Sequence, residues 1–174
     1  HAAQETKSLS LSAKAAFLYE AQSQTVLFAK NENARMPMAS TTKIMPALIA
    51  LEECEGDEVI VIDEESVGIE GSSAYLRAGD ELTMEELAYA LLLQSANDAA
   101  VAIARHIGGS IEAFADIMNE RAKALGLSDT HFENPHGLDS EQHYTTAHDL
   151  ALIARAALQH PSLRSIMATR SITM

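Results

Sequence analysis

The strongest helical pattern in the chain opens with Met38-Ala39-Ser40-Thr41-Thr42-Lys43-Ile44-Met45 and continues to about Glu53. Pro37 cannot lie inside this helix, because its ring clashes with the preceding turn, so the helix begins after it. Residues three apart lie on one face of a helix, and the Ser40 hydroxyl can therefore reach the Lys43 amine. Taken alone, S-x-x-K is a common spacing, and its simplest interpretation is a capping serine followed by a solvated lysine.

The same two residues also have the chemistry of a catalytic pair. A serine hydroxyl is a weak nucleophile and needs an adjacent base. Lysine can be that base only when it is neutral, a state that burial or a neighbouring cation produces. Backbone N–H groups at a helix start can also stabilise an oxyanion. Ser40 is thus a candidate nucleophile and Lys43 its candidate base.

A second candidate motif is Ser95-Ala96-Asn97, at the point where one predicted helix ends and the next begins. Ser and Asn both favour turns and caps, which is the simplest explanation of the motif. The functional interpretation is a hydroxyl at Ser95 that relays a proton and an amide at Asn97 that orients a substrate carbonyl or the lysine.

The rest of the chain alternates short strands with longer helices. Two β-prone segments flank a polar turn, and a short buried strand follows the first helix. Thr83 and Glu86 form a capping box that opens another helix. The predicted strands are 13–19, 25–29 and 59–62; the predicted helices are 40–53, 83–94, 98–107, 110–126 and one from Thr145 or Thr146 to His160-Pro161; residues 127–144 are predicted to form an irregular loop.

Composition narrows the class of protein. The 174 residues suit a single domain with a sizeable core. Twelve basic against 25 acidic side chains give a net charge of −13, which disfavours nucleic acid and anionic membranes as partners. The one cysteine, Cys54, can form no disulfide within the chain and is expected to be a structural thiol. No apolar run reaches the roughly 18 residues of a membrane helix.

Two further stretches join these motifs: Phe132-Glu133-Asn134-Pro135-His136-Gly137-Leu138-Asp139 and His143-Tyr144-Thr145-Thr146-Ala147-His148-Asp149-Leu150-Ala151. With S-x-x-K and S-x-N, this set resembles the low-molecular-weight penicillin-binding proteins that are D-alanyl-D-alanine carboxypeptidases. The resemblance implies an α/β transpeptidase fold of the penicillin-binding-protein and β-lactamase type, with a sheet and a helical region. On this basis residues 1–12 are expected to be a flexible N-terminal segment and residues 13–174 a partial transpeptidase-like domain.

The resemblance also implies a reaction and a set of partners. Ser40 would attack the bond between two D-alanines at the end of a peptidoglycan stem peptide, with Lys43 as base. Ser95 would pass a proton to the leaving D-alanine, and Asn97 would bind the substrate amide. An acyl-serine would form and be hydrolysed without a metal or other cofactor, and β-lactams would acylate the same serine. Because the expected substrate is peptidoglycan, the resemblance also implies an extracytoplasmic protein. It would be associated with the membrane only through a segment not present here.

One family motif is missing. The third motif, K-T-G, would lie on a later strand, and no lysine in this chain precedes Thr-Gly. The fold is therefore expected to lack its C-terminal strands, and a truncated non-catalytic fragment or a peptidoglycan-binding module is one alternative. A serine β-lactamase is another, but it needs an E-x-x-x-N motif. Here Glu133 is followed directly by Asn134, and position 137 is Gly, which disfavours that alternative.

The histidines of the predicted loop invite a metal interpretation, which their spacing does not favour. His131, His136, His143 and His148 recur at intervals that differ from the i, i+4 pairing of a helical zinc site. His136 and His148 are instead expected to hold the loop by hydrogen bonds. His143 and Tyr144 are expected at the edge of the cleft.

Overall fold

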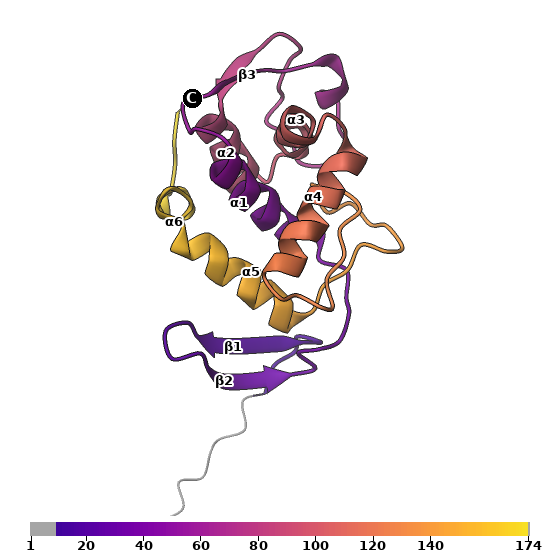
Figure 1. Cartoon of the computed structure of the whole chain (residues 1–174), viewed down its shortest axis with the longest axis vertical. Helices are drawn as coiled ribbons and strands as arrows, with labels where there is room; N and C mark the ends of the chain where they lie inside the picture. The colour runs from indigo at the N-terminus through magenta and orange to yellow at the C-terminus, as the bar shows by residue number, and fades with distance from the viewer. Residues whose placement is uncertain (1–9, 174) are drawn as a thin grey trace, which may run out of the picture.

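The computed structural model describes residues 10–173 and is organised around one buried helix, α1 (Ile44–Glu53). Five other helices contact it, so that α1 runs through the middle of the molecule (Figure 1). Met45, Leu48 and Ile49 are no more than 2% exposed. From the sequence, the apolar residues of this helix, Ile44, Met45, Leu48, Ile49 and Leu51, are expected to pack inward. The structure buries all of them except Ile44, which is half-buried.

The surrounding helices follow one another in chain order. They are α2 (Met84–Leu93), α3 (Asn97–Gly108), α4 (Ile111–Ala124), α5 (Ala147–Gln159) and α6 (Pro161–Ala168). Side-chain caps hold the starts of α2, α4 and α5, and the one at α2 is the capping box predicted above. Thr83 and Glu86 form a reciprocal capping box at α2, and the Ser110 hydroxyl accepts the Ala113 N–H at α4.

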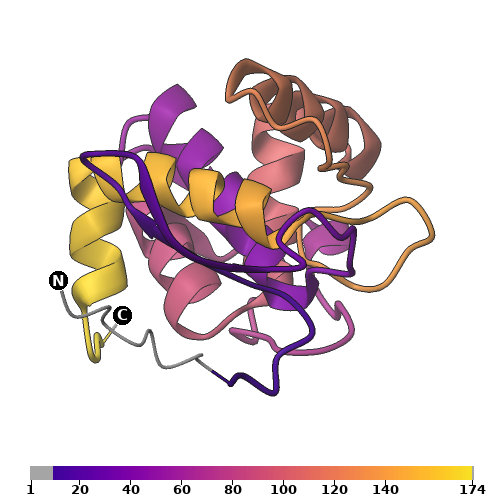
Figure 2. The ribbon, with the colours of Figure 1, turned by 90° about the horizontal axis from the view of Figure 1, so that it is seen from below.

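The strands form two small antiparallel sheets. In the first, β1 (Ala16–Glu20) pairs with β2 (Thr25–Lys30), as the hairpin prediction requires, and β1 packs against α5 (Figures 1 and 2). In the second, β3 (Val59–Val61) pairs with β4 (Glu81–Thr83) on the far side of the helices (Figure 1). Within residues 10–173 the fold therefore has a helical region and two-stranded sheets only.

The structure differs from the sequence prediction in the second of these sheets. The segment 59–62 was expected to be a buried strand, but Val59 and Val61 are 55% and 62% exposed. Only Ile60 of β3 points into the core, at 3% exposure. In a half-buried strand, apolar and polar residues usually alternate in the sequence. Every residue of 59–62 is apolar, so the sequence does not show which of these side chains are exposed.

Two helix boundaries also differ from the prediction. The first turn of the nucleophile segment is a 3-10 helix (Ala39–Lys43), and the α-helix begins only at Ile44. The chain was expected to stop being helical at His160-Pro161, yet Pro161 is the first residue of α6. Proline is well suited to that first position, because the N–H that it lacks would have no helical partner there.

The predicted irregular loop, residues 127–144, is closed on itself and is held to α4 by hydrogen bonds. His131 and Tyr144 exchange backbone hydrogen bonds of 2.9 and 3.0 Å, which closes the loop on itself. The Asn119 side chain on α4 both donates to and accepts from the Phe132 backbone, at 2.8 Å each. The loop is thus a fixed part of the structure, and it reaches the start of α1.

The predicted flexible segment, residues 1–12, falls largely on residues 1–9, which lie outside the described residues. Across residues 10–173, none of the helices combines the length and the apolar character that crossing a bilayer requires.

Candidate active site

Ser40 and Lys43 lie together at the start of α1. Ser40 is exposed on the 3-10 turn, whereas the Lys43 side chain behind it is only 2% exposed. The Lys43 Nζ atom lies 3.2 Å from the Ser40 Oγ atom and donates a second hydrogen bond of 2.7 Å to the backbone oxygen of His136. The structure therefore places an accessible hydroxyl directly against a buried amine.

Burial also changes the acidity of that amine. Removal from water lowers the pKa of Lys43 to about 8, because the charged ammonium loses its hydration. No carboxylate contributes to this shift. A measurable fraction of the amine is then neutral near physiological pH, and neutral lysine can accept the proton of a serine hydroxyl.

The turn that carries Ser40 has an unusual backbone. Ala39 adopts a left-handed conformation with φ 45°, which is costly for a residue with a side chain. Gly137 from the 127–144 loop packs against this turn, and a Cβ atom at position 137 would overlap the Ala39 carbonyl oxygen. Gly137 itself has φ 89°, so both its conformation and its surroundings require glycine.

His143 fastens the same loop to the same turn. Its Nδ1 atom accepts the Glu133 backbone N–H at 3.0 Å, so the ring proton lies on Nε2. Nε2 then donates to the Thr42 hydroxyl at 2.8 Å. The expectation that His143 lines the edge of the cleft is wrong: it is 4% exposed and lies beneath the nucleophile turn.

Ser95 faces the cavity in front of Ser40. The cavity has a volume of about 390 Å³. Its lining residues are Ser40, Thr41, Lys43, Ile44, Leu91, Leu92, Leu93, Ser95 and Met167. Ser95 has φ 57°, a left-handed conformation that a non-glycine residue adopts only when its surroundings hold it there. Both candidate catalytic serines therefore lie at strained turns that open onto one cavity.

Asn97, the predicted substrate-binding residue, does not line this cavity. It is 4% exposed, and its Nδ2 group donates to the Glu70 backbone oxygen at 2.6 Å. Its backbone N–H donates to Ser72 at 2.7 Å. Asn97 thus connects the S-x-N turn to the 68–77 loop beside it, and a Cβ at Gly71 would collide with the Asn97 amide.

Asp98 is a site residue that the sequence analysis missed. Its carboxylate is 1% exposed and accepts hydrogen bonds from the Ser73 hydroxyl and from the backbone N–H groups of Ala74 and Leu76. Burial pushes the pKa of Asp98 up, but these bonds together outweigh burial and hold the pKa below its usual range. The residue organises the loop beside Asn97. No spacing rule singles out an aspartate that binds backbone amides far along the chain.

Met167 lines the cavity in front of Ser40, and the sequence did not indicate it. It lies on α6, a helix that was not expected, and adds an apolar side chain to the cavity lining. Because the sequence prediction ended the last helix at Pro161, it could not place Met167 at the cavity.

Comparison with known proteins identifies the family of this chain. Residues 2–174 match the model of the D-alanyl-D-alanine carboxypeptidase family of S11 peptidases. The D-alanyl-D-alanine carboxypeptidase DacF of Bacillus subtilis is 38% identical over 169 residues, which cover 94% of this chain and 43% of DacF. The chain thus spans less than half the length of that relative.

Solved structures agree. The D-alanyl-D-alanine carboxypeptidase DacD of Francisella tularensis superposes with a TM-score of 0.87 at 36% identity, covering 91% of this chain and 40% of the other. Penicillin binding protein 6B of Escherichia coli gives 0.82 at 30% identity, covering 87% and 51%. These neighbours confirm the predicted fold class, an α/β fold of the penicillin-binding-protein type. The chain belongs to the D-alanyl-D-alanine carboxypeptidase family.

Proposed function

We propose that this protein is a serine D,D-carboxypeptidase that removes the terminal D-alanine from peptidoglycan stem peptides through an acyl-serine intermediate. The observation that carries the proposal is the pairing of the exposed Ser40 hydroxyl with the buried Lys43 amine at 3.2 Å. A nucleophile, a base of lowered pKa and an adjoining cavity are three of the parts that acyl transfer needs.

Each step assigns a proton to a named group. Neutral Lys43 takes the Ser40 proton as Oγ attacks the carbonyl carbon between the two D-alanines, and a tetrahedral oxyanion forms. The C–N bond then breaks, and the leaving amine receives a proton that Ser95 relays from the Lys43 ammonium. Water repeats the attack on the acyl-serine ester, with Lys43 again as base, and releases the shortened peptide.

Asn97 is proposed as the substrate-binding amide. Its Nδ2 group is engaged by Glu70, but among the described residues none donates a hydrogen bond to its Oδ1 atom. A carbonyl-type oxygen can accept an N–H from a peptide substrate. The bond to Glu70 holds the amide through Nδ2 and leaves this oxygen free to accept a hydrogen bond from a substrate that reaches it.

The cavity wall suits a small apolar substrate group. Ile44, Leu91 and Leu92 line it beside the two serines. Burial of methyl groups such as those of alanine against these side chains would contribute about 0.8 kcal/mol for each carbon removed from water. Because the substrate belongs to the cell wall, we place the reaction in peptidoglycan biosynthesis and cell-shape maintenance, outside the cytoplasm.

The test uses a penicillin, which acylates the nucleophile of such enzymes and forms a slowly hydrolysed ester. Intact-mass spectrometry after incubation should show one adduct on the protein and none on the Ser40→Ala variant. Thr41→Ala, which removes the neighbouring exposed hydroxyl, is the matched control and should still be acylated. Absence of an adduct on the folded protein would contradict the proposal. Rapid turnover of nitrocefin would instead favour a β-lactamase.

A further inference from the structure

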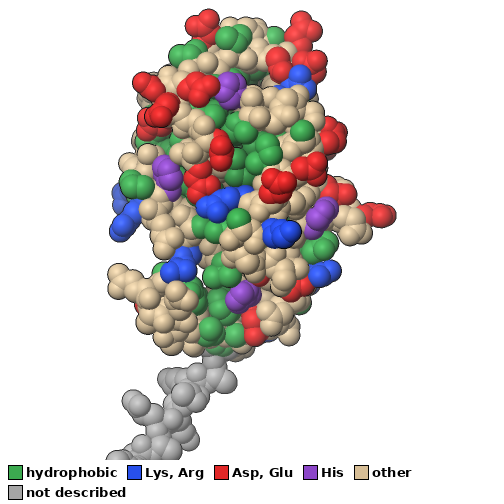
Figure 3. Space-filling view, viewed as in Figure 1, with side chains coloured by type: hydrophobic (Ala, Val, Ile, Leu, Met, Phe, Trp, Pro, Cys, Tyr) green, Lys and Arg blue, Asp and Glu red, His purple; other side chains and the backbone are tan. Residues whose placement is uncertain are grey.

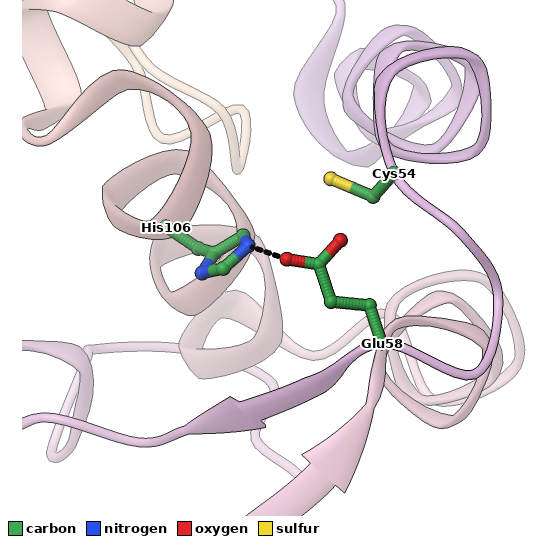
Figure 4. A group of neighbouring side chains, drawn as sticks. All are labelled: Cys54, Glu58 and His106. Atoms are coloured by element: carbon green, nitrogen blue, oxygen red, sulfur yellow. Dashed lines mark hydrogen bonds and ion pairs between the residues drawn. The ribbon is translucent and has the colours of Figure 1, made fainter.

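A second group of reactive side chains lies at the opposite end of α1 from Ser40. Cys54 directly follows α1, Glu58 directly precedes β3, and His106 lies in the last turn of α3. One potential ligand atom from each residue lies within 4.8 Å of the other two. Figure 4 shows the three side chains pointing toward one another, with the Glu58 carboxylate hydrogen-bonded to the His106 ring.

The backbone beneath this group is held in place. The Cys54 N–H donates to Ala50 at 3.1 Å, which completes the last turn of α1. The Glu58 carbonyl accepts the Met84 N–H at 2.9 Å, and the Glu58 N–H donates to Glu55 at 3.1 Å. Since His106 is part of a regular helix, all three side chains project from fixed positions. Such a group needs only side-chain adjustments to close on a ligand.

Protons now occupy the places that a metal ion could take. A carboxylate only accepts hydrogen bonds, so the 2.9 Å contact between Glu58 and His106 Nε2 carries a ring proton. Free cysteine is mostly protonated at neutral pH, so the Cys54 sulfur, which lies within 4.8 Å of the other two ligand atoms, carries a second proton. A divalent cation would replace both protons.

The charge around the group favours a cation. Among the residues that the structure describes, His106 is the only ion-pair partner of Glu58. Glu53, Glu55 and Asp57 are close in sequence, and acidic side chains are prominent at the upper end of Figure 3, where β3 lies in Figure 1. The local field therefore attracts positive charge.

We propose that Cys54, Glu58 and His106 form a binding site for a borderline divalent transition metal ion, Zn²⁺ in particular, with water as the fourth ligand. Thiolate, imidazole and carboxylate are all zinc ligands, and a thiolate disfavours Mg²⁺ and Ca²⁺. Glu58 and His106 have side-chain exposures of 41% and 31%, which leaves a solvent path for the ion and for the water.

The proposed ion would take no part in the chemistry at Ser40. The ten residues of α1 span about 15 Å, so this site lies well away from Ser40 and Lys43. It would tie together the end of α1, the start of β3 and the end of α3. Neither its existence nor its test depends on the proposed carboxypeptidase activity.

Cobalt spectroscopy tests the site without an activity readout. Because Cys54 is the only cysteine in the chain, a Co²⁺–thiolate charge-transfer band can arise only from this residue. Titration of the purified protein with CoCl₂ should produce the band at one equivalent, and ZnCl₂ should abolish it by displacement. The variant Cys54→Ser should lack the band. Glu58→Gln and His106→Gln should each weaken Co²⁺ binding about tenfold or more.

His131→Gln is the matched control, because it removes a histidine of the 127–144 loop, and it should leave the titration unchanged. Saturating Zn²⁺ should also raise the melting temperature of the unsubstituted protein and of His131→Gln but not that of Cys54→Ser. Circular dichroism checks that each variant is folded. No band at stoichiometric Co²⁺, or a band that Glu58→Gln and His106→Gln leave intact, would overturn the proposal.

Discussion

Gly137 lies against the carbonyl of Ala39, the residue that precedes the candidate nucleophile, with no room for a side chain between them. Ala39 is itself in the left-handed region, so its carbonyl direction depends on support from the loop. The neighbouring residue, His136, directs its own carbonyl at the Lys43 amine. One stretch of the 127–144 loop thus shapes both the serine turn and the position of the base.

This contact predicts a large effect of Gly137→Ala. The new Cβ would collide with the Ala39 oxygen and lie 2.8 Å from the Thr42 hydroxyl, in a backbone conformation that alanine disfavours. The strain and the overlap together should lower the free energy of unfolding by about 3 kcal/mol or more. Acylation of Ser40 by a penicillin should slow at least about tenfold, because the nucleophile turn must shift.

Gly79→Ala is the matched control for that variant. Gly79 has φ 88°, against 89° for Gly137, but no atom lies within 4 Å of the position of its Cβ. In this variant the free energy of unfolding, measured in urea, should fall by only about 1–2 kcal/mol, which is the cost of the backbone conformation alone. Its acylation rate should stay unchanged. Equal losses in the two variants would show that the contact with Ala39 contributes nothing.

A buried hydrogen bond gives the second prediction. Thr42→Val and His143→Phe each break the 2.8 Å bond between the hydroxyl and the ring and leave a polar group without its partner. His143→Phe also removes the acceptor of the Glu133 N–H. Phenylalanine keeps the edge-to-face packing on Phe132. Each variant should lose about 1–3 kcal/mol, and the double variant should lose about 1 kcal/mol less than the sum.

The control for that cycle is Thr41→Val. Thr41 is exposed and its hydroxyl donates to the Met38 carbonyl, on the same turn but away from His143. Its effect should add to that of His143→Phe within about 0.5 kcal/mol. Additivity in the Thr42 cycle as well would mean that the ring does not stabilise the nucleophile turn.

Local sequence patterns predicted much of this fold. The hairpin, the capping box of α2 and the buried face of α1 all follow from spacings of a few residues, and the structure contains each of them. Helix α6 was missed because Pro161 was interpreted as a stop, although proline is equally suited to a first helical position. Distinguishing the two requires the tertiary packing of Leu163 and Ile166, which are fully buried.

The site was predictable only in part, for a similar reason. The S-x-x-K spacing brought Ser40 and Lys43 together because three residues make one helical turn. The acceptor of the second Lys43 hydrogen bond is a backbone oxygen 93 residues away. Every residue has a backbone oxygen, so the residue types do not show which one accepts this bond. His143 was expected at the edge of the cleft, whereas the packing of the loop buries it.

His136 gives a prediction about acid stability. Burial, with smaller contributions from the charges of Lys43 and His143, lowers the pKa of His136 to about 4 from an ordinary 6.5. The unfolded chain therefore binds this proton first as the pH falls. The contribution of neutral His136 to stability is present above about pH 6.5 and is lost progressively toward pH 4. Because the ring is partly exposed, we expect a loss of about 1–2 kcal/mol over this range.

Urea unfolding at pH 7 and pH 5 measures this slope. In His136→Asn the side-chain oxygen can still accept the Leu138 N–H, as Nδ1 does at 3.2 Å, but nothing at position 136 titrates. The fall in stability between the two pH values should be smaller in this variant than in the unsubstituted protein. Lys43→Met removes one cause of the shift and should reduce the slope less. An unchanged slope in His136→Asn would contradict the assignment.

The lowered pKa of Lys43 gives the prediction closest to the proposed chemistry. Only the neutral amine can accept the Ser40 proton, and the pKa is about 8 instead of the ordinary 10.5. The second-order rate constant of acylation by a penicillin should therefore rise about tenfold per pH unit below pH 8 and level off above it. Quenched reactions analysed by intact mass give this rate. An inflection of the profile near pH 10 would mean that burial does not lower the pKa of Lys43.

Two variants distinguish the proposed base, Lys43, from a lysine that takes no part in acylation. Lys43→Arg keeps a cation that cannot become neutral in this range and should lose acylation by about a hundredfold or more at every pH. Lys123→Met removes an exposed lysine on α4 and should leave the profile unchanged. If Lys43→Arg kept both its rate and its inflection, another group would have to take the Ser40 proton, and the pairing at 3.2 Å would be structural only.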